Sequence, residues 1–87
     1  MRIDFSKRFL KDVQKADKKV RLAFVDRLEL FIGDKFHPLL NNHALTGQYS
    51  GYRSINVTGD IRAVFEELAK GQTIYFITIG SHSQLYG

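Results

Sequence analysis

Three short apolar segments, separated by polar breaks, run through residues 51–76 and constrain the fold more than any other feature of the sequence. The segments are rich in β-branched and aromatic residues, which favour strands, and each break contains a glycine, as tight turns often require. We therefore predict a three-stranded antiparallel meander, with strands near residues 51–57, 61–68 and 73–79. The preceding residues are expected to cover this sheet, and residues 80–87 to lie back against it as a tail.

The residues before the meander carry helical periodicity. Arg2–Phe5 is a short strand candidate, and Ser6 can cap a helix over residues 7–16, whose apolar residues recur at helical spacing. Asp17 can cap a second helix over residues 18–32, which has its own apolar stripe. Two helices so close in sequence predict a hairpin whose apolar sides cover the sheet. The predicted fold class is α+β: an N-terminal strand and a two-helix hairpin packed on an antiparallel β-sheet of about four strands.

Length and composition limit the class of protein. With 87 residues, the chain is expected to form a single domain over residues 1–87. Seven Phe and four Tyr supply the apolar surface that a disordered chain lacks. The absence of cysteine excludes disulfides and thiolate zinc sites. No apolar run is long enough to cross a bilayer and Met1 does not open a signal peptide, so we expect a cytoplasmic protein without a membrane partner.

Positive charge is concentrated in the first part of the chain. The net charge is +4, and ten of the thirteen Lys and Arg residues precede residue 36. Lys7, Lys11 and Lys15 recur on one side of the first predicted helix. This pattern is typical of a surface that contacts nucleic acid or an acidic partner, and it is equally typical of a solvated helix face. We take Lys11 and Lys15 as candidate RNA contacts.

Two histidines flank the meander and are candidates for catalysis. His43 precedes the first predicted strand and His82 follows the last one. Imidazole titrates near neutral pH, so one histidine can accept a proton while the other donates one; both can equally be ordinary surface residues. His37, next to Pro38, is interpreted as a surface residue. Because the histidines lack the spacing of metal ligands and no carboxylate cluster joins them, we expect neither a metal nor a cofactor.

Two arginines and an aspartate have both a functional and a structural interpretation. Arg53 and Arg62 lie on neighbouring predicted strands, where two guanidinium groups can clamp a phosphate through forked hydrogen bonds. They can instead form surface ion pairs with Glu66 or Glu67. Asp60 lies in a predicted turn, where its side chain either caps backbone N–H groups or orients a nearby histidine.

An aromatic and an amide complete the set of candidates. Tyr86, near the end of the chain, can anchor the terminus by packing, or it can stack on a base or hydrogen-bond a phosphate. Asn56, on the first predicted strand of the meander, can serve the structure or contact a substrate.

The sequence carries, in this order, the motifs NNHALTG, GYRSINV, GDIRAVFEE and IGSHSQLYG. Their order resembles the RelE/ParE toxin superfamily, and within it the YafQ-like branch of messenger-RNA interferases. The likeness covers essentially the whole chain, and the first and last motifs are its specific part, because the helices alone match many proteins. The resemblance implies the RelE-like microbial RNase fold.

The same resemblance implies a function. Toxins of this branch belong to type II toxin–antitoxin systems, bind in the ribosomal A site and cut messenger RNA without a metal. The ribose 2′-hydroxyl attacks the adjacent phosphate, which leaves a 2′,3′-cyclic phosphate and a 5′-hydroxyl. The implied partners are a cognate antitoxin, in a toxin–antitoxin hetero-oligomer, and the ribosome with its messenger RNA.

The resemblance also carries roles to individual residues. The loop histidine before the LxG motif corresponds to His43, the aspartate of the hairpin turn to Asp60, and the histidine of the C-terminal motif to His82. The terminal aromatic corresponds to Tyr86, and the strand arginine that other members direct at the phosphate corresponds to Arg62. The hypothesis is that His82 is the acid and His43 the base or its orienting partner, supported by Asp60.

Two positions depart from the family pattern, and both bear on activity. Asn56 stands where the branch has a second histidine, and Ser54 stands where it has an aspartate. An amide cannot transfer a proton, so an acid–base pair has to come from His43 and His82. Both departures favour one alternative, a catalytically degenerate toxin that acts through antitoxin binding and operon repression. The superfamily offers a second alternative, a ParE-like toxin that inhibits gyrase, and the pair of His43 and His82 argues against it.

Overall fold

The two predicted helices form within one residue of their expected ends. In the computed structural model, which describes residues 1–86, they are α1 (Lys7–Lys15) and α2 (Lys18–Gly33). Ser6 caps α1 as predicted, because its Oγ accepts a hydrogen bond of 2.9 Å from the backbone N–H of Phe9. Asp17 precedes α2 as predicted, but its side chain makes no capping bond.

The predicted meander is present at the centre of a larger sheet. Residues 1–86 contain five paired strands, in chain order β1 (Arg2–Phe5), β2 (His43–Ala44), β3 (Arg53–Asn56), β4 (Ile61–Leu68) and β5 (Thr73–Ser81). Their order across the sheet is β1-β5-β4-β3-β2. Strands β3, β4 and β5 are antiparallel neighbours, so the α+β class and the meander are confirmed.

Two details of the predicted sheet differ from the observed one. It has five strands rather than about four, and it is mixed, because β1 runs parallel to β5 with Ile3 paired to Ile74. A parallel pair needs a long crossover, and the chain between β1 and β5 provides one. The additional strand, β2, is only two residues long, His43–Ala44, and pairs with β3. So short a strand has no alternation that sequence reasoning can detect.

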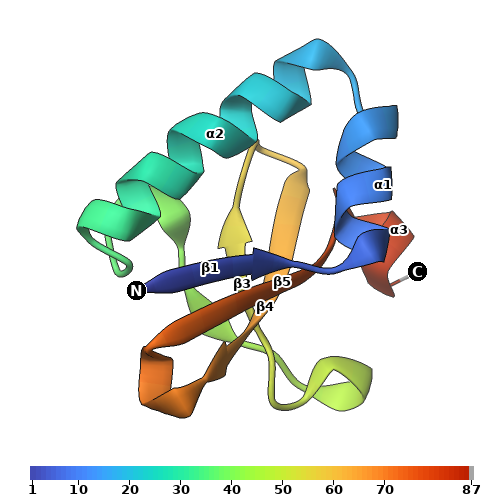
Figure 1. Ribbon diagram of the computed structural model, residues 1–87. Helices are drawn as coiled ribbons and strands as arrows, with labels where there is room; N and C mark the ends of the chain where they lie inside the picture. The colour runs from blue at the N-terminus through green and yellow to red at the C-terminus, as the bar shows by residue number, and fades with distance from the viewer. Residues whose placement is uncertain (87) are drawn as a thin grey trace.

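The hydrophobic core lies between the helices and one face of the sheet. Figure 1 shows α2 lying across the strands, with α1 beside β5. The ring of Phe76 on β5 is central, with ring centroids at 5.4 to 6.1 Å from those of Phe5, Phe9, Phe24, Phe31 and Phe65. Such aromatic packing combines a large buried apolar area with favourable ring geometry. None of the helices in this described part of the chain has the length and apolar character that crossing a bilayer requires.

The segment predicted as a tail, residues 80–87, contains a short helix, and residue 87 lies outside the described part of the chain. After β5, residues His82–Tyr86 form α3, which begins with a reciprocal capping box. The backbone N–H of Ser81 donates to Gln84 Oε1 at 2.8 Å, and the N–H of Gln84 donates to Ser81 Oγ at 3.1 Å. Gly80 allows α3 to fold close to the sheet, since a Cβ there would lie 3.1 Å from Gln84 Oε1. The S-x-x-Q pattern of Ser81–Gln84 is the local sequence signal for the start of this helix.

Candidate functional site

Four of the predicted site residues line one surface hollow of about 300 Å3. They are His43 from β2, Arg62 from β4, and His82 and Tyr86 from α3. The rest of the lining is small or apolar apart from two hydroxyls, and consists of Ala44, Leu45, Thr46 and Ser54. The two histidines, 39 positions apart in the sequence, therefore meet over one patch together with an arginine, as the sequence interpretation required.

Strand register explains why these side chains share a face. Residues that are paired across antiparallel strands project to the same side of a sheet. His43 is paired with Ser54 on the edge of the sheet, and Asn56 is paired with Arg62 further along the same two-strand ladder. Because Ser54 and Asn56 are two residues apart on β3, both pairs project to the face opposite the helices. α3 then folds back beside this face and brings His82 to it.

The imidazole of His43 is held in one tautomer. Its Nδ1 lies 2.7 Å from the backbone carbonyl oxygen of Asn41, and a carbonyl can only accept a hydrogen bond. Nδ1 therefore carries the proton, and in the neutral ring the lone pair lies on Nε2. His43 is exposed, so this nitrogen is accessible to a ligand. The arrangement gives His43 the form that a general base needs.

Arg62 is held against the β3–β4 turn. Its Nη1 donates to the carbonyl oxygens of Thr58, Gly59 and Ile61 at 3.0 to 3.2 Å, and its Nη2 donates to Gly59 at 3.2 Å. These bonds fix the plane of the guanidinium beside the hollow. Among the hydrogen bonds within residues 1–86, none uses its Nε, which remains available for an anionic oxygen. Arg62 thus brings a fixed positive charge to the site.

Tyr86 and His82 form a ring pair on α3. Their ring centroids are 4.7 Å apart, with an interplanar angle of 49°. Burial raises the pKa of the Tyr86 hydroxyl above its ordinary value of 10.0, and the nearby Tyr49 adds to the rise. The Ser54 hydroxyl and the Arg62 guanidinium oppose it by favouring the phenolate. Because the net shift of the pKa is upward, Tyr86 is protonated at neutral pH, and its hydroxyl can donate a hydrogen bond.

Three buried polar atoms on this face have no hydrogen-bond partner within residues 1–86: Ser54 Oγ, Asn56 Oδ1 and Thr78 Oγ1. Ser54 lines the hollow, and the register joins it through Val64 to Thr78 in one row across the sheet. The Ser54 hydroxyl lies near enough to Tyr86 to affect the pKa of that phenol, although the two make no hydrogen bond of standard geometry. An unpaired buried polar group lowers stability, so this face is not optimised for folding alone.

The other predicted site residues do not line the hollow: Arg53, Asn56, Asp60, Lys11 and Lys15. Arg53 is paired with Phe65, and therefore projects toward the helix side of the sheet, where its Nε donates to Asn42 Oδ1 at 2.8 Å. Its guanidinium also lies 5.6 Å from the ring centroid of Phe36. The predicted phosphate clamp of Arg53 with Arg62 does not form, because the register places the two side chains on opposite faces.

Asp60 reaches the site through its backbone. Its carbonyl oxygen accepts a hydrogen bond of 3.3 Å from the N–H of His82, which ties the β3–β4 turn to the start of α3. Its carboxylate is exposed, and among the described residues it makes no hydrogen bond to either His43 or His82. An orienting role of that carboxylate stays a prediction.

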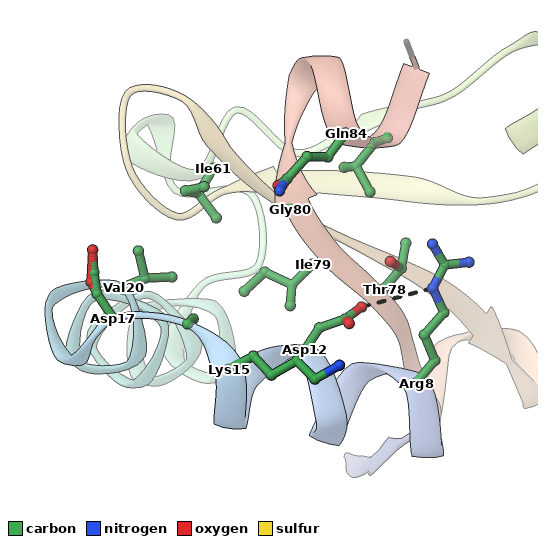
Figure 2. A pocket seen from close by; sticks show the side chains of 12 residues that line it. Arg8, Asp12, Lys15, Asp17, Val20, Ile61, Thr78, Ile79, Gly80 and Gln84 are labelled. Atoms are coloured by element: carbon green, nitrogen blue, oxygen red, sulfur yellow. Dashed lines mark ion pairs between the residues drawn. The ribbon is translucent and has the colours of Figure 1, made fainter.

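Lys11 and Lys15 also lie away from the hollow. Both are exposed on α1, and Lys15 lines a separate groove of about 410 Å3 between α1 and α3. Figure 2 shows this groove, with Gln84 on one side and the ion pair of Arg8 and Asp12, 3.7 Å apart, on the other. α3 separates the two depressions: His82 and Tyr86 belong to the first, Gln84 and Leu85 to the second. A role of the lysines in binding RNA stays a prediction.

Sequence reasoning did not single out Tyr49. This residue ends the 3-10 turn η2 (Gly47–Tyr49), and its ring centroid lies 5.4 Å from that of Tyr86 at an interplanar angle of 84°. Gln48, in the same turn, donates from Nε2 to the carbonyl oxygen of Leu85 at 3.2 Å. No local pattern indicates that residues 47–49 contact the end of the chain, because that contact depends on how β2 and α3 are placed.

A family model and solved structures both relate this chain to the same family of proteins. The sequence matches, over residues 1–87, the family model described as the bacterial toxin of type II toxin–antitoxin system, YafQ. Among solved structures, it is similar to YafQ from E. coli, with 25% identity, a TM-score of 0.82 and 100% of both chains covered. It is also similar to the E. coli DinJ–YafQ toxin–antitoxin complex, with 26% identity, a TM-score of 0.78, and 98% of this chain and 96% of the other covered.

A more distant structure shares the fold. The YoeB/ParE toxin from Agrobacterium tumefaciens is 22% identical, with a TM-score of 0.77 and coverage of 94% of this chain and 99% of the other. No curated protein matches the sequence. Since the family model spans the chain and the structural likeness covers the same residues, the protein belongs to the YafQ family of bacterial toxins of type II toxin–antitoxin systems.

Proposed function

We propose that this toxin is a ribosome-dependent, metal-independent endoribonuclease that cleaves messenger RNA. One observation carries the proposal: His43, Arg62 and His82 line a single hollow, although they come from three separate elements. Cleavage of RNA by its own 2′-hydroxyl needs a base, an acid and positive charge beside the phosphate. An imidazole with an accessible Nε2, a second imidazole and a fixed guanidinium supply these three groups.

In the proposed reaction, His43 Nε2 accepts the proton of the ribose 2′-hydroxyl. The freed O2′ attacks the adjacent phosphorus, and the bond from phosphorus to O5′ breaks. His82, as an imidazolium, donates a proton to the departing O5′. The products are a 2′,3′-cyclic phosphate and a 5′-hydroxyl, and Arg62 stabilises the negative charge on the phosphate oxygens during the transfer.

Other residues position the RNA in this proposal. Tyr86 lines the same hollow, where its ring stacks near the scissile step and its hydroxyl donates a hydrogen bond. Asn56, next to Arg62 in the sheet, contacts the nucleotide through its amide. Lys11 and Lys15 contact RNA phosphates outside the hollow, so they affect binding more than the chemical step. Arg53 has no part in the proposal, because it is held against Asn42 and Phe36.

The proposed protein partner is a cognate antitoxin. The E. coli DinJ–YafQ structure, which this chain resembles over 98% of its length, is a toxin–antitoxin complex. We infer a corresponding hetero-oligomer here, in which the antitoxin blocks access to the ribosome or to the hollow. The other proposed partners are the ribosome and its messenger RNA, which places the protein in the cytoplasm.

The test is induced expression in bacterial cells, followed by mapping of messenger-RNA ends by primer extension. The expected result is new 5′ ends within translated codons, which disappear when the neighbouring antitoxin gene is co-expressed. His82→Ala should abolish these ends, since acid–base groups contribute about 10²–10⁴-fold to rate. His37→Ala is the matched control, because His37 lies outside the hollow and should leave cleavage unchanged.

Other outcomes identify the alternatives. Damage to DNA that depends on gyrase, without cuts in messages, would indicate a gyrase inhibitor and overturn the proposal. Absence of both effects would indicate a toxin that only binds its antitoxin. The amide of Asn56 is the observation that favours this last alternative. It stands where the YafQ-like branch, which this chain resembles, has a histidine that can transfer a proton. Its Oδ1 is buried without a hydrogen-bond partner among residues 1–86.

A further inference from the structure

The last turn of the chain depends on contacts from outside itself. α3 has only five residues, which is too short for a helix to persist in water on its own. Its start is fixed by the capping box of Ser81 and Gln84, and Leu85 anchors it in the protein with an exposed fraction of 5%. The end of α3 carries Tyr86, and both His82 and Tyr86 depend on how this helix is held.

The turn η2 holds the end of α3 through two side chains. Gln48 Nε2 donates to the carbonyl oxygen of Leu85 at 3.2 Å, which satisfies one of the carbonyls that a helix leaves unpaired at its C-terminus. The ring of Tyr49 meets the ring of Tyr86 in a T-shaped contact, at 5.4 Å and 84°. Tyr86 in turn lies 4.7 Å from the imidazole of His82. A continuous row of rings therefore connects η2 with a proposed acid.

The turn that provides these contacts is itself well ordered by the backbone. The N–H of Tyr49 donates to Thr46 O at 3.3 Å, that of Ser50 donates to Gly47 O at 3.0 Å, and that of Tyr52 donates to Tyr49 O at 3.0 Å. Gly47 has a φ of +64°, a conformation that favours glycine. The ring of Tyr52 also lies 6.4 Å from that of Tyr49. Backbone hydrogen bonds within η2 and to Tyr52 thus define the position from which Tyr49 contacts Tyr86.

We propose that Tyr49 is a positioning residue of this site: its ring fixes Tyr86 and, through Tyr86, the imidazole of His82, while Gln48 holds the carbonyl end of the same helix. The expected effect of Tyr49 on catalysis rests on the proposed ribonuclease function, whereas its effect on the position of α3 does not. Tyr49 does not line the hollow, so it acts on the site through Tyr86 and not on the RNA. Its hydroxyl also raises the pKa of Tyr86, which gives a spectroscopic reporter of the contact.

The experiment compares Tyr49→Ala, Tyr49→Phe and Phe36→Ala in the free protein and on ribosomes. In the free protein, amide hydrogen exchange over residues 82–86 and the NMR signals of His82 and Tyr86 report on α3. Tyr49→Ala should speed exchange there by about tenfold, the size expected for one lost aromatic pair, and should shift the His82 ring signals. Tyr49→Phe keeps the ring and should preserve exchange, while the pKa of Tyr86 falls toward its ordinary value.

On ribosomes, Tyr49→Ala should lower the single-turnover cleavage rate by about tenfold or more at unchanged KM, and Tyr49→Phe should restore it. Phe36→Ala removes another aromatic of a connecting segment, distant from α3, and should leave both measurements unchanged. Unaltered exchange and NMR signals in Tyr49→Ala would overturn the proposal. If the unmodified protein does not cleave messages, the ribonuclease function fails, and the exchange and NMR data alone decide whether Tyr49 positions α3.

Discussion

Both faces of the sheet contain fully buried side chains, but the chemistry of those side chains differs. On the helix-covered face, Ile55, Phe65 and Phe76 are fully buried and contact other apolar side chains. On the opposite face, Ser54 and Thr78 are 1% and 2% exposed, and their hydroxyls have no partner within the described chain. Burial of apolar groups stabilises a fold, whereas burial of unpaired hydroxyls lowers its stability.

This difference indicates a division of roles within a very small protein. The helix-covered face supplies the free energy of folding, and the other face carries the side chains of the hollow at some loss of stability. Such a loss is common where a surface is selected for activity. Substitutions on the helix-covered face should therefore mainly lower the free energy of unfolding, whereas substitutions of side chains in the hollow should mainly lower activity.

Phe76→Ala should have the largest effect on stability. The ring of Phe76 contacts five other phenylalanine rings, so its removal leaves a cavity in the centre of the core. We expect the free energy of unfolding in urea to fall by about 3–5 kcal/mol, a large part of the total for a small domain. His82→Ala, on the other face, should change it by less than about 0.5 kcal/mol. Comparable losses for both variants would remove the contrast between the faces.

Ser6→Ala should have the next largest effect. Ser6 Oγ accepts from the N–H of Phe9 at 2.9 Å and donates to the carbonyl oxygen of Ile77 at 2.8 Å, so it joins α1 to β5. Loss of an N-cap of this kind should lower the free energy of unfolding by about 1–2 kcal/mol, measured by urea unfolding. Thr46→Ala is the control, because Thr46 occupies a cap position without a side-chain capping bond and should be neutral.

Thr78→Val should increase stability. The substitution keeps the shape of the side chain and replaces a buried hydroxyl that has no partner among residues 1–86. We expect a gain of up to about 1 kcal/mol in the free energy of unfolding. Thr58→Val is the contrasting control: its Oγ1 accepts hydrogen bonds from the N–H groups of Ile61 and Asp60, so this variant should lose stability. A loss in Thr78→Val would mean that its hydroxyl is satisfied in solution.

Alkaline pH should produce the smallest effect, through Tyr86. Its pKa is raised in the folded protein, mainly by burial, so between the unfolded and folded pKa values the folded state binds more protons than the unfolded one. Stability contributed by the neutral phenol is therefore present below about pH 10 and is lost as pH rises through the folded pKa. Tyr86→Phe should flatten this decrease in the free energy of unfolding above pH 10, measured by urea unfolding at several pH values.

Much of the fold followed from local patterns in the sequence. Helical periodicity placed α1 and α2 to within one residue, and the apolar segments with their glycine-containing breaks located β4 and β5. The S-x-x-Q signal for α3 was present but was missed, because residues 80–87 were interpreted as a tail. The motif order alone indicated the YafQ-like branch, which the family match over residues 1–87 confirms.

The composition of the hollow was predictable only in part. Period two correctly separates Arg53 from Ser54 and Asn56, but it does not state which residues of β4 face them. The register pairs Asn56 with Arg62 and Arg53 with Phe65, and this pairing excludes the predicted arginine clamp. Register depends on long-range pairing and on the turn, so a one-residue shift would have reversed every face.

The sequence by itself therefore determined the two long helices, the meander and the family, because hydrophobic periodicity, caps and turn glycines act over a few residues. Only the tertiary structure decided that β1 runs parallel to β5, that His43, Arg62 and His82 share a hollow, and that Tyr49 contacts Tyr86. Each of these contacts joins residues far apart in the chain. Their geometry is fixed by how the whole sheet pairs and how α3 packs, which no local segment encodes.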